Sequence, residues 1–373
     1  MVGPMKAKSE TTRAGDGATP PRFAKNILLA VLAGMLIYAF LGAFLDYKEM
    51  KRVFSSFAPW QIILPFGLIC AIYLIDTFRF RLLFKQFGIK LSKRDALYSN
   101  VIGYFFSCIT PSSAGGQPFQ IYHFTKLGID STVATNIVFS RLMVSTLSQL
   151  LVIIAFAYPG VHLIATMGGS GLILGLGLAL TIGTSLLLFL VFTRPTLLGR
   201  LVLRLESSFI GRRIGKGVKD ERWAEKFSAW SLGLGDSFSY LWAKRFGIVL
   251  VDLLLHVLDH GLWALGLYLP LRALSGLEIP FSTFFFAFNL CGLVSYFVPT
   301  PGASGSVEAA YTLVLGGLTG MPGASLSAVI LWRFSTYYLH LVLGGIVYFF
   351  VRTERKVYEV APDGTKKRLA PRA

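Results

Sequence analysis

Two arginines lie inside long apolar stretches, and they are the side chains best placed to do chemistry in this sequence. Arg141 follows Ile137-Val-Phe-Ser140, and Arg333 follows Val329-Ile-Leu-Trp. A guanidinium inside an apolar span is costly and marks either a ligand pathway or a buried ion pair. Its fork of N–H donors can hold a phosphate through two parallel hydrogen bonds. We therefore interpret both arginines as phosphate ligands, with an ion pair to Glu308 as the structural alternative.

Each arginine follows a short polar segment that interrupts an apolar region. The first break covers residues 110–118 and the second covers residues 299–306. Proline lacks an amide donor and glycine favours loops, so neither segment can continue a helix. The amides of a restarting helix attract anions, although the breaks could also serve only to let the chain turn. The residues that we predict to bind a ligand are Thr110, Pro111, Ser112, Ser113, Gly115, Gly116, Gln117, Arg141, Thr300, Pro301, Gly302, Gly305, Glu308 and Arg333.

A third group consists of Asp252, His256, Asp259 and His260. Their spacing puts them on one face of a helix. They could form a proton relay, half of a metal site, or hydrogen bonds inside a helix bundle. No further acidic or histidine cluster completes a coordination shell, so we expect neither a metal nor another cofactor. The sequence contains no P-loop, GxSxG or HExxH pattern, and His123, His162 and His340 are isolated.

The composition indicates that these residues lie in a membrane protein. The 373 residues are 54% hydrophobic and 15% charged, whereas soluble domains carry roughly 25% charged residues. The formal net charge of +17 could indicate nucleic acid, but the charges gather between apolar spans, which favours anionic lipid as the partner. The three cysteines also lie in apolar segments and are expected to be inert: Cys70, Cys108 and Cys291.

Six apolar runs are long enough to cross a membrane. They cover residues 26–45, 58–77, 132–157, 171–192, 246–268 and 324–351, and the regions 96–126 and 281–320 contain the breaks. Most lysines and arginines lie in four segments, which are 1–25, 79–95, 193–245 and 352–373. Loops rich in these residues face the cytoplasm. All four basic segments can face the cytoplasm only if region 96–126 enters the membrane from that side, turns and returns to it.

The same reasoning makes region 281–320 enter from the opposite side, which leaves 158–170 and 269–280 external. Two complete crossings are the alternative for 281–320. We therefore predict an all-α polytopic membrane protein with about six full transmembrane helices and two oppositely oriented re-entrant hairpins. Residues 1–24 form a disordered cytoplasmic tail, 25–352 the transmembrane domain, and 353–373 a basic cytoplasmic tail. Loop 193–245 should include helices on the cytoplasmic surface, with a solvated linker as the alternative.

The two halves of the chain form a sparse internal repeat. Thr110-Pro111 precedes Arg141 by nearly the same interval as Thr300-Pro301 precedes Arg333. Halves of opposite orientation are the plan of secondary transporters, which bind substrates near the bilayer midplane at broken helices. We therefore expect the two breaks to approach each other near the midplane, with both arginines facing one polar cavity.

These motifs resemble a known family. The Gly115-Gly116 pair with Tyr122 and Gly128, the run Pro301-Gly-x-x-Gly-x-x-Glu308 and then Arg333 are similar to the flippase-like transmembrane region of lysylphosphatidylglycerol synthases. The resemblance covers about residues 25–352 and implies a lipid-translocating domain with two re-entrant hairpins. Two departures, Ser140 where an acidic residue is expected and Gln120 near a common basic position, bear on the identity of the lipid.

The chain ends soon after its last span, so we expect neither the aminoacyl-transfer domain of full-length synthases nor its enzymatic chemistry. The expected function is movement of an anionic phospholipid or a polyprenyl-phosphate-type precursor between leaflets of the inner membrane, with both termini cytoplasmic. A membrane-embedded enzyme acting on lipid headgroups is one alternative, favoured if Asp252 and His256 face the cleft. A non-transporting lipid-binding scaffold is the other, favoured if the hairpins pack without a polar cavity. Nucleic acid is not an expected partner, and a homodimer is left open.

Overall fold

The computed structural model describes residues 58–158, 221–295, 298 and 300–350, together with scattered positions between 175 and 193 and the short stretches 358–360 and 366–368. The predicted span 26–45, most of 171–192, the tail 1–24 and the first part of loop 193–245 lie outside the described residues. The external segment 158–170 does too, apart from its first residue.

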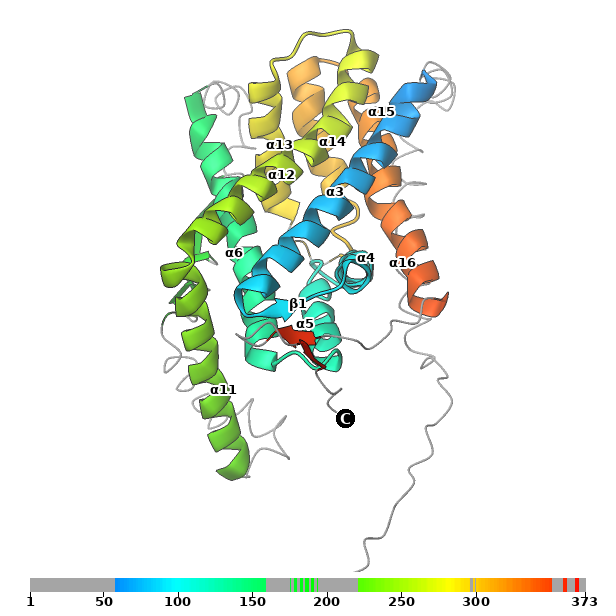
Figure 1. The fold of residues 1–373 in the computed structure, drawn as a ribbon. Helices are drawn as coiled ribbons and strands as arrows, with labels where there is room; N and C mark the ends of the chain where they lie inside the picture. The colour runs from blue at the N-terminus through cyan, green and yellow to red at the C-terminus, as the bar shows by residue number, and fades with distance from the viewer. Residues whose placement is uncertain are drawn as a thin grey trace, which may run out of the picture.

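Four long apolar helices form the frame of the protein (Figure 1). They are α3 (Pro59–Gln86), α6 (Ser131–Ala155), α12 (Phe246–Ser275), and α15 (Pro322–Arg333), which continues through the π-helical turn η2 (Phe334–Tyr338) into α16 (Leu339–Phe350). Each contains a stretch long and apolar enough to cross a membrane. The all-α membrane architecture is confirmed, and these four helices lie where four of the six spans are predicted.

Local sequence signals explain where several helices begin and end. Ser92 accepts a hydrogen bond from the Asp95 amide at 3.0 Å, which caps the start of α4. Asp130 caps α6 through the Thr132 amide at 2.8 Å. Helix α12 ends at Gly276, whose φ of 64° is the left-handed conformation that glycine adopts without strain.

Two broken hairpins connect the long helices. The first consists of α4 (Lys93–Ile109) and α5 (Gly116–Lys126), and the second of α13 (Phe281–Ser295) and α14 (Ser306–Thr319). Helix α3 ends and α6 begins toward the lower end of Figure 1, whereas α12 ends and α15 begins at the upper end. The hairpins therefore join helix ends on opposite sides of the bundle. Helix α4 is seen almost end-on in this view, so it crosses the other helices.

Two further features lie at the lower end of the bundle. Helix α11 (Glu221–Ser239) and the π-helical turn η1 (Tyr240–Lys244) form within the predicted loop 193–245, and α11 packs on Met143 of α6 through Leu234 and Phe238. Strands β1 (Ile89–Lys90), β2 (Tyr358–Val360) and β3 (Lys366–Arg368) pair in this order as a small antiparallel sheet. The segment predicted as a plain basic tail, 353–373, thus contains two strands that pair next to the α3–α4 connection.

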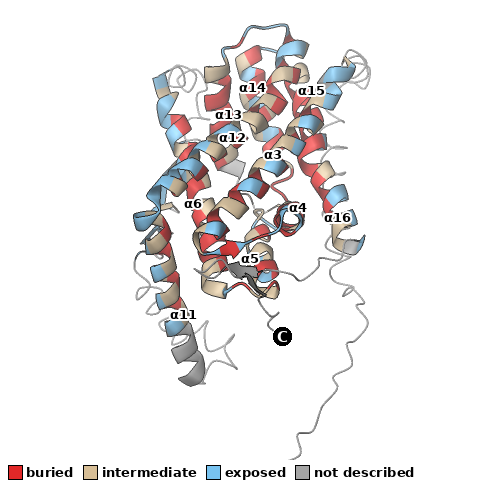
Figure 2. Cartoon of the chain, in the orientation of Figure 1, coloured by how far each residue is buried: buried red, intermediate tan, exposed pale blue. Residues whose placement is uncertain are grey.

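The core lies between the helices and the apolar outer faces remain exposed. One buried cluster joins α12, α13, α14 and α15 around Phe284, Tyr311 and Trp332. Another joins α3, α5 and α6 around Phe80 and Phe124. Figure 2 shows buried residues gathered toward the inside of the bundle and exposed ones along its outer faces. Large exposed apolar residues such as Leu74, Ile154, Leu254 and Leu313 suit a surface that faces lipid.

Candidate functional site

Both breaks fold into the same pair of overlapping turns. In each, the backbone amides of the fourth and fifth residues donate to the carbonyls of the threonine and the proline. The four hydrogen bonds run from Ser113 to Thr110 at 3.2 Å, from Ala114 to Pro111 at 3.1 Å, from Ala303 to Thr300 at 3.0 Å and from Ser304 to Pro301 at 3.1 Å. The repeat predicted from the Thr-Pro spacing therefore extends to the backbone conformation.

The turns hold residues in the left-handed region that L-amino acids rarely adopt. Ser112 and Ser113 have φ values of 51° and 55°, and Gly302 and Ala303 have 57° and 54°. A type II turn with proline at its second position needs a positive φ at the third. Such conformations cost about 1–3 kcal/mol for residues other than glycine and gather at ligand sites, which supports a functional reading of both breaks.

The two breaks touch each other, as predicted. Pro111 and Pro301 form an antiparallel backbone bridge. The Gly302 amide donates to the Thr110 carbonyl at 3.3 Å, and the Ser112 hydroxyl donates to the Val298 carbonyl at 3.4 Å. The hairpins are thus joined by backbone at the points where their helices are interrupted.

A cavity of about 690 Å³ opens beside this junction. From the predicted ligand residues its wall includes Ser112, Ser113, Gln117, Gly302 and Arg333. Within the described part of the chain, its wall does not include Thr110, Pro111, Gly115, Gly116, Thr300, Pro301, Gly305 and Glu308, and these residues belong to the turns and caps behind it. The two breaks therefore share one cavity, with a guanidinium in its wall.

Arg333 is both ion-paired and placed at the cavity. Its Nε donates to Oε1 of Glu308 at 2.7 Å, and its Nη2 donates to the Ser304 hydroxyl at 3.1 Å and the Gly302 carbonyl at 3.4 Å. The guanidinium lies 4.4 Å from the ring centre of Tyr337. The other carboxylate oxygen of Glu308 accepts the Gly305 amide at 2.7 Å, which caps α14. These contacts fix the guanidinium against the second break.

Arg141 does not join this group, which corrects the prediction that both arginines face one cavity. Its Nη2 forms an ion pair with Asp76 on α3, and its guanidinium lies 3.8 Å from the ring centre of Phe80. Among the described residues, the cavity wall includes Arg333 but not Arg141. The partner of Glu308 is therefore Arg333, and Arg141 belongs to a second buried cluster.

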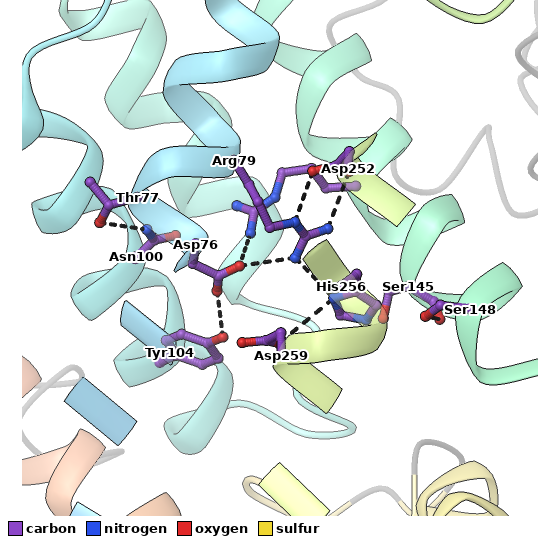
Figure 3. Close-up of polar contacts among 11 residues, drawn as sticks. Asp76, Thr77, Arg79, Asn100, Tyr104, Ser145, Ser148, Asp252, His256 and Asp259 are labelled. Carbon is purple, nitrogen blue, oxygen red and sulfur yellow. Dashed lines mark hydrogen bonds and ion pairs between the residues drawn. The ribbon is translucent and has the colours of Figure 1, made fainter. Parts of the chain in front are cut away.

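This second cluster is built around Arg79, which the sequence analysis placed in a basic loop (Figure 3). The Arg79 side chain is 2% exposed and lies within α3. Its Nε and Nη2 donate to the two carboxylate oxygens of Asp252 at 2.8 and 3.2 Å. Its Nη1 contacts Asp76 at 3.0 Å and Nδ1 of His256 at 2.9 Å. Tyr104 donates to the other oxygen of Asp76 at 2.7 Å.

The group predicted on one face of α12 divides between the two sites. Asp252 faces Arg79, whereas His256, Asp259 and His260 line the cavity. Nδ1 of His256 lies 3.7 Å from the Asp259 carboxylate. The residues thus share a helix face as predicted, and their role as a proton relay stays a prediction.

Sequence reasoning missed four residues of these sites, which are Asp76, Arg79, Tyr104 and His340. Asp76 and Arg79 are one helical turn apart at the end of an apolar run, which is the spacing of a pair on one helix face. That signal was present in the sequence. His340 lines the cavity, and its ring lies 4.7 Å from that of Tyr104. No local pattern around either of these two rings predicts that they meet.

Comparison with known proteins places the chain in a family. Residues 27–344 match the family described as the lysylphosphatidylglycerol synthase TM region. A UPF0104 membrane protein of Archaeoglobus fulgidus is 26% identical over 346 residues, which cover 86% of this chain and 94% of that protein. A UPF0104 membrane protein of Methanocaldococcus jannaschii is 21% identical over 338 residues, which cover 89% and 97%. This chain is therefore a multi-pass membrane protein that belongs to the lysylphosphatidylglycerol synthase TM region family.

Proposed function

We propose that this protein moves an anionic phospholipid, or a lipid-linked precursor of the polyprenyl-phosphate type, between the leaflets of the inner membrane. The observation that carries the proposal is the junction of the two breaks beside a cavity of about 690 Å³ with Arg333 in its wall. Broken helices that meet within an inverted repeat are where secondary transporters hold their substrates. The headgroup passes through the cavity while the acyl chains stay in the bilayer.

The contacts of Arg333 suit reversible binding of a phosphate. Glu308 neutralises the guanidinium when the cavity holds no anion, because its Oε1 lies 2.7 Å from Nε. A phosphate then competes for the same planar fork of donors. Glu308 keeps its second hydrogen bond to the Gly305 amide during this exchange. The guanidinium thus has an anionic partner at every stage, whereas Glu308 keeps the Gly305 amide bond but loses its cation while the phosphate is bound.

The distribution of charge supports both termini on the cytoplasmic side. Lys85, Lys93, Arg94 and Lys126 lie near the end of the bundle where α3 ends and α6 begins. The opposite end, where α12 ends and α13 begins, carries only Arg272 and Glu278 between residues 269 and 280, and these two form an ion pair at 2.8 Å. Basic connections face the cytoplasm. In this orientation the first hairpin is re-entrant from the cytoplasm and the second from outside.

A membrane-embedded enzyme acting on headgroups is the second candidate. His256 and Asp259 line the cavity, and these are residue types that serve as acid and base. Asp252 accepts two hydrogen bonds from Arg79 and does not line the cavity, so it is not placed to act as an acid or base there. The cavity itself weighs against a scaffold without transport, since that reading requires hairpins that pack without one.

The test is a translocation assay with purified protein in liposomes that contain tail-labelled fluorescent lipids. We expect faster protein-dependent movement of phosphatidylglycerol than of phosphatidylcholine. Arg333→Lys should slow it about tenfold or more, because a lost charge-assisted hydrogen bond costs roughly 1.5–3 kcal/mol. Arg245→Lys, the same change at an exposed arginine at the start of α12, should have no effect. Equal rates with and without protein for every anionic lipid would refute the proposal.

A further inference from the structure

Five charged side chains gather in the interior where α3, α6 and α12 meet, and their charges do not balance. Asp76, Asp252 and Asp259 are carboxylates, whereas Arg79 and Arg141 are guanidinium groups. Arg79 holds Asp252 through two hydrogen bonds and shares Asp76 with Arg141. These four charges cancel one another. Asp259 is the carboxylate for which this network supplies no cation.

His256 does not supply the missing positive charge. Nη1 of Arg79 lies 2.9 Å from Nδ1 of His256. A guanidinium only donates hydrogen bonds, so Nδ1 must accept with its lone pair. The imidazole therefore carries its proton on Nε2 and is neutral. Nε2 is buried and has no hydrogen-bond partner within the described part of the chain.

Asp259 lies at the boundary between this network and the cavity. The residue is 2% exposed and lines the cavity wall. Its Oδ1 accepts no hydrogen bond from any described residue. Figure 3 shows its carboxylate turned toward Tyr104, whose hydroxyl donates to Asp76. A buried carboxylate without a cation is strongly disfavoured in its ionised form, and a bound proton removes the charge.

The ionisable groups around Asp259 come from several elements. The charged and histidine groups that face the network or the cavity are Asp76 and Arg79 on α3, Arg141 on α6, Arg333 and His340 on the α15–α16 helix, and Asp252, His256 and His260 on α12 itself. The tyrosine and cysteine side chains that do so are Tyr104 and Cys108 on α4, Tyr311 on α14 and Tyr337 on η2. Helix α13, which also packs on α12, carries no Asp, Glu, Lys, Arg or His. Asp76 adds a second negative charge near Asp259, and Arg79 and Arg141, which act against it, form their ion pairs with Asp76 and Asp252.

We propose that Asp259 is a proton-binding carboxylate that takes up a proton when an anionic headgroup enters the cavity. This inference rests on the proposed binding of an anionic lipid. A phosphate in the same cavity adds negative charge near Asp259, and a nearby like charge favours the neutral form of a carboxyl group. Because linkage is reciprocal, a protonated Asp259 also strengthens binding of the anion. Lipid and proton then occupy the cavity together, which couples movement of the lipid to a proton gradient.

The test measures proton uptake when dihexanoyl phosphatidylglycerol, a short-chain anionic lipid, is added to the full-length protein in weakly buffered detergent solution with a pH indicator dye. Lipid binding is measured in parallel by calorimetry. For the unmodified protein we expect uptake of up to one proton per bound lipid, with a maximum at pH values where Asp259 is ionised without lipid and protonated with it, and none at lower pH where Asp259 is already protonated, as linkage requires for a single coupled group. Asp259→Asn, which imitates the protonated carboxyl, should bind lipid and take up close to none. Asp236→Asn, the same change at an exposed aspartate of α11, should behave as the unmodified protein.

The carboxyl stretching band in the infrared spectrum supplies a second measurement that needs no lipid. A band that titrates with pH and is lost in Asp259→Asn, but kept in Asp236→Asn, would show that Asp259 binds a proton. Unchanged proton uptake in Asp259→Asn, or lipid binding without uptake at every pH tested in the unmodified protein, would overturn the inference while the proposed transport stands. Failure of the anionic lipid to bind would overturn the coupling and the proposed function together. If the lipid fails to bind but the infrared band of Asp259 still titrates, Asp259 binds a proton without any coupling to lipid.

Discussion

Pro111 and Pro301, from opposite halves of the chain, form an antiparallel backbone bridge. Neither proline can donate a backbone hydrogen bond, so the Gly302 amide supplies the bond to the Thr110 carbonyl at 3.3 Å. Tyr337 packs on the same point, and its hydroxyl donates to the Cys108 carbonyl at 3.4 Å. Movement of one hairpin must therefore either carry the other with it or break this junction.

We expect Gly302→Ala to destabilise the protein. A Cβ at this position would lie 2.4 Å from Cε2 of Tyr337 and 3.0 Å from the Cys108 carbonyl oxygen, in a backbone conformation with φ of 57°. Overpacking of this kind costs typically 1–3 kcal/mol, and the left-handed conformation adds about 1–3 kcal/mol for a residue other than glycine. Thermal unfolding in detergent should show a clear decrease in Tm.

The matched control is Gly317→Ala on the exposed face of α14. No atom lies within 4 Å of the Cβ that this change would add. Alanine is favoured over glycine inside a helix, so stability should be equal or slightly higher. Equal Tm values for the two alanine variants would show that the junction does not constrain the hairpins.

The sequence was sufficient for those features that rest on local chemistry. Apolar length predicted the four described spans, and the Thr-Pro pairs predicted two equivalent breaks that meet. The ion pair of Glu308 is the expected structural alternative, with its partner left open between Arg141 and Arg333, and the structure shows that the partner is Arg333. At α3 the predicted span ends at residue 77 and Arg79 is counted with the basic segment 79–95, whereas the helix runs to Gln86 and holds both Asp76 and Arg79. Helix α3 instead continues because these charges are neutralised by Asp252 and Arg141.

Partners from distant helices could not be derived in this way. Asp252 and Arg79 are far apart in sequence, and only the packing of α12 against α3 brings them together. The pairing of β2 with β1 likewise joins segments that are far apart in sequence, so it depends on how α16 and α3 are placed in the bundle. Pattern and composition describe each element, whereas such contacts depend on the arrangement of all of them.

Asp252→Ala should strongly destabilise the protein. The change leaves Arg79, whose side chain is 2% exposed, without its two-pronged partner. Removing one member of a buried ion pair costs roughly 3–5 kcal/mol. Asp236→Ala on the exposed face of α11 should change Tm little, because exposed charges contribute at most about 1 kcal/mol. A similar small shift for both variants would mean that the Arg79 cluster is hydrated rather than buried.

The orientation can be tested by cysteine labelling in a Cys70→Ala background. Glu278→Cys lies in the connection between α12 and α13, and Lys93→Cys lies at the start of α4; both positions are exposed. A membrane-impermeant maleimide applied to intact cells should label position 278 and leave position 93 unlabelled. Permeabilised cells should show labelling at both positions. Labelling of position 93 from outside would reverse the orientation and remove the charge argument for re-entrant hairpins.

The last prediction separates the two roles of Arg333. Arg333→Ala should lower stability by roughly 3–5 kcal/mol, because it leaves Glu308 unpaired in a site where that residue is 1% exposed. It should also abolish translocation of anionic lipid if the guanidinium holds the phosphate. Loss of activity in this variant alone cannot distinguish these effects, since an unfolded protein is inactive as well.

The double variant Arg333→Ala with Glu308→Ala makes the distinction. It removes both charges, so most of the lost stability should return, less about 1 kcal/mol for the Glu308 cap on α14. If Arg333 is only a structural partner of Glu308, translocation should return together with Tm. If it binds the phosphate, Tm should recover while translocation stays at the level of protein-free liposomes. The control is Glu308→Ala alone, which keeps the arginine and measures the effect of losing the cap on α14. Recovery of both Tm and translocation in the double variant would exclude Arg333 as the headgroup ligand.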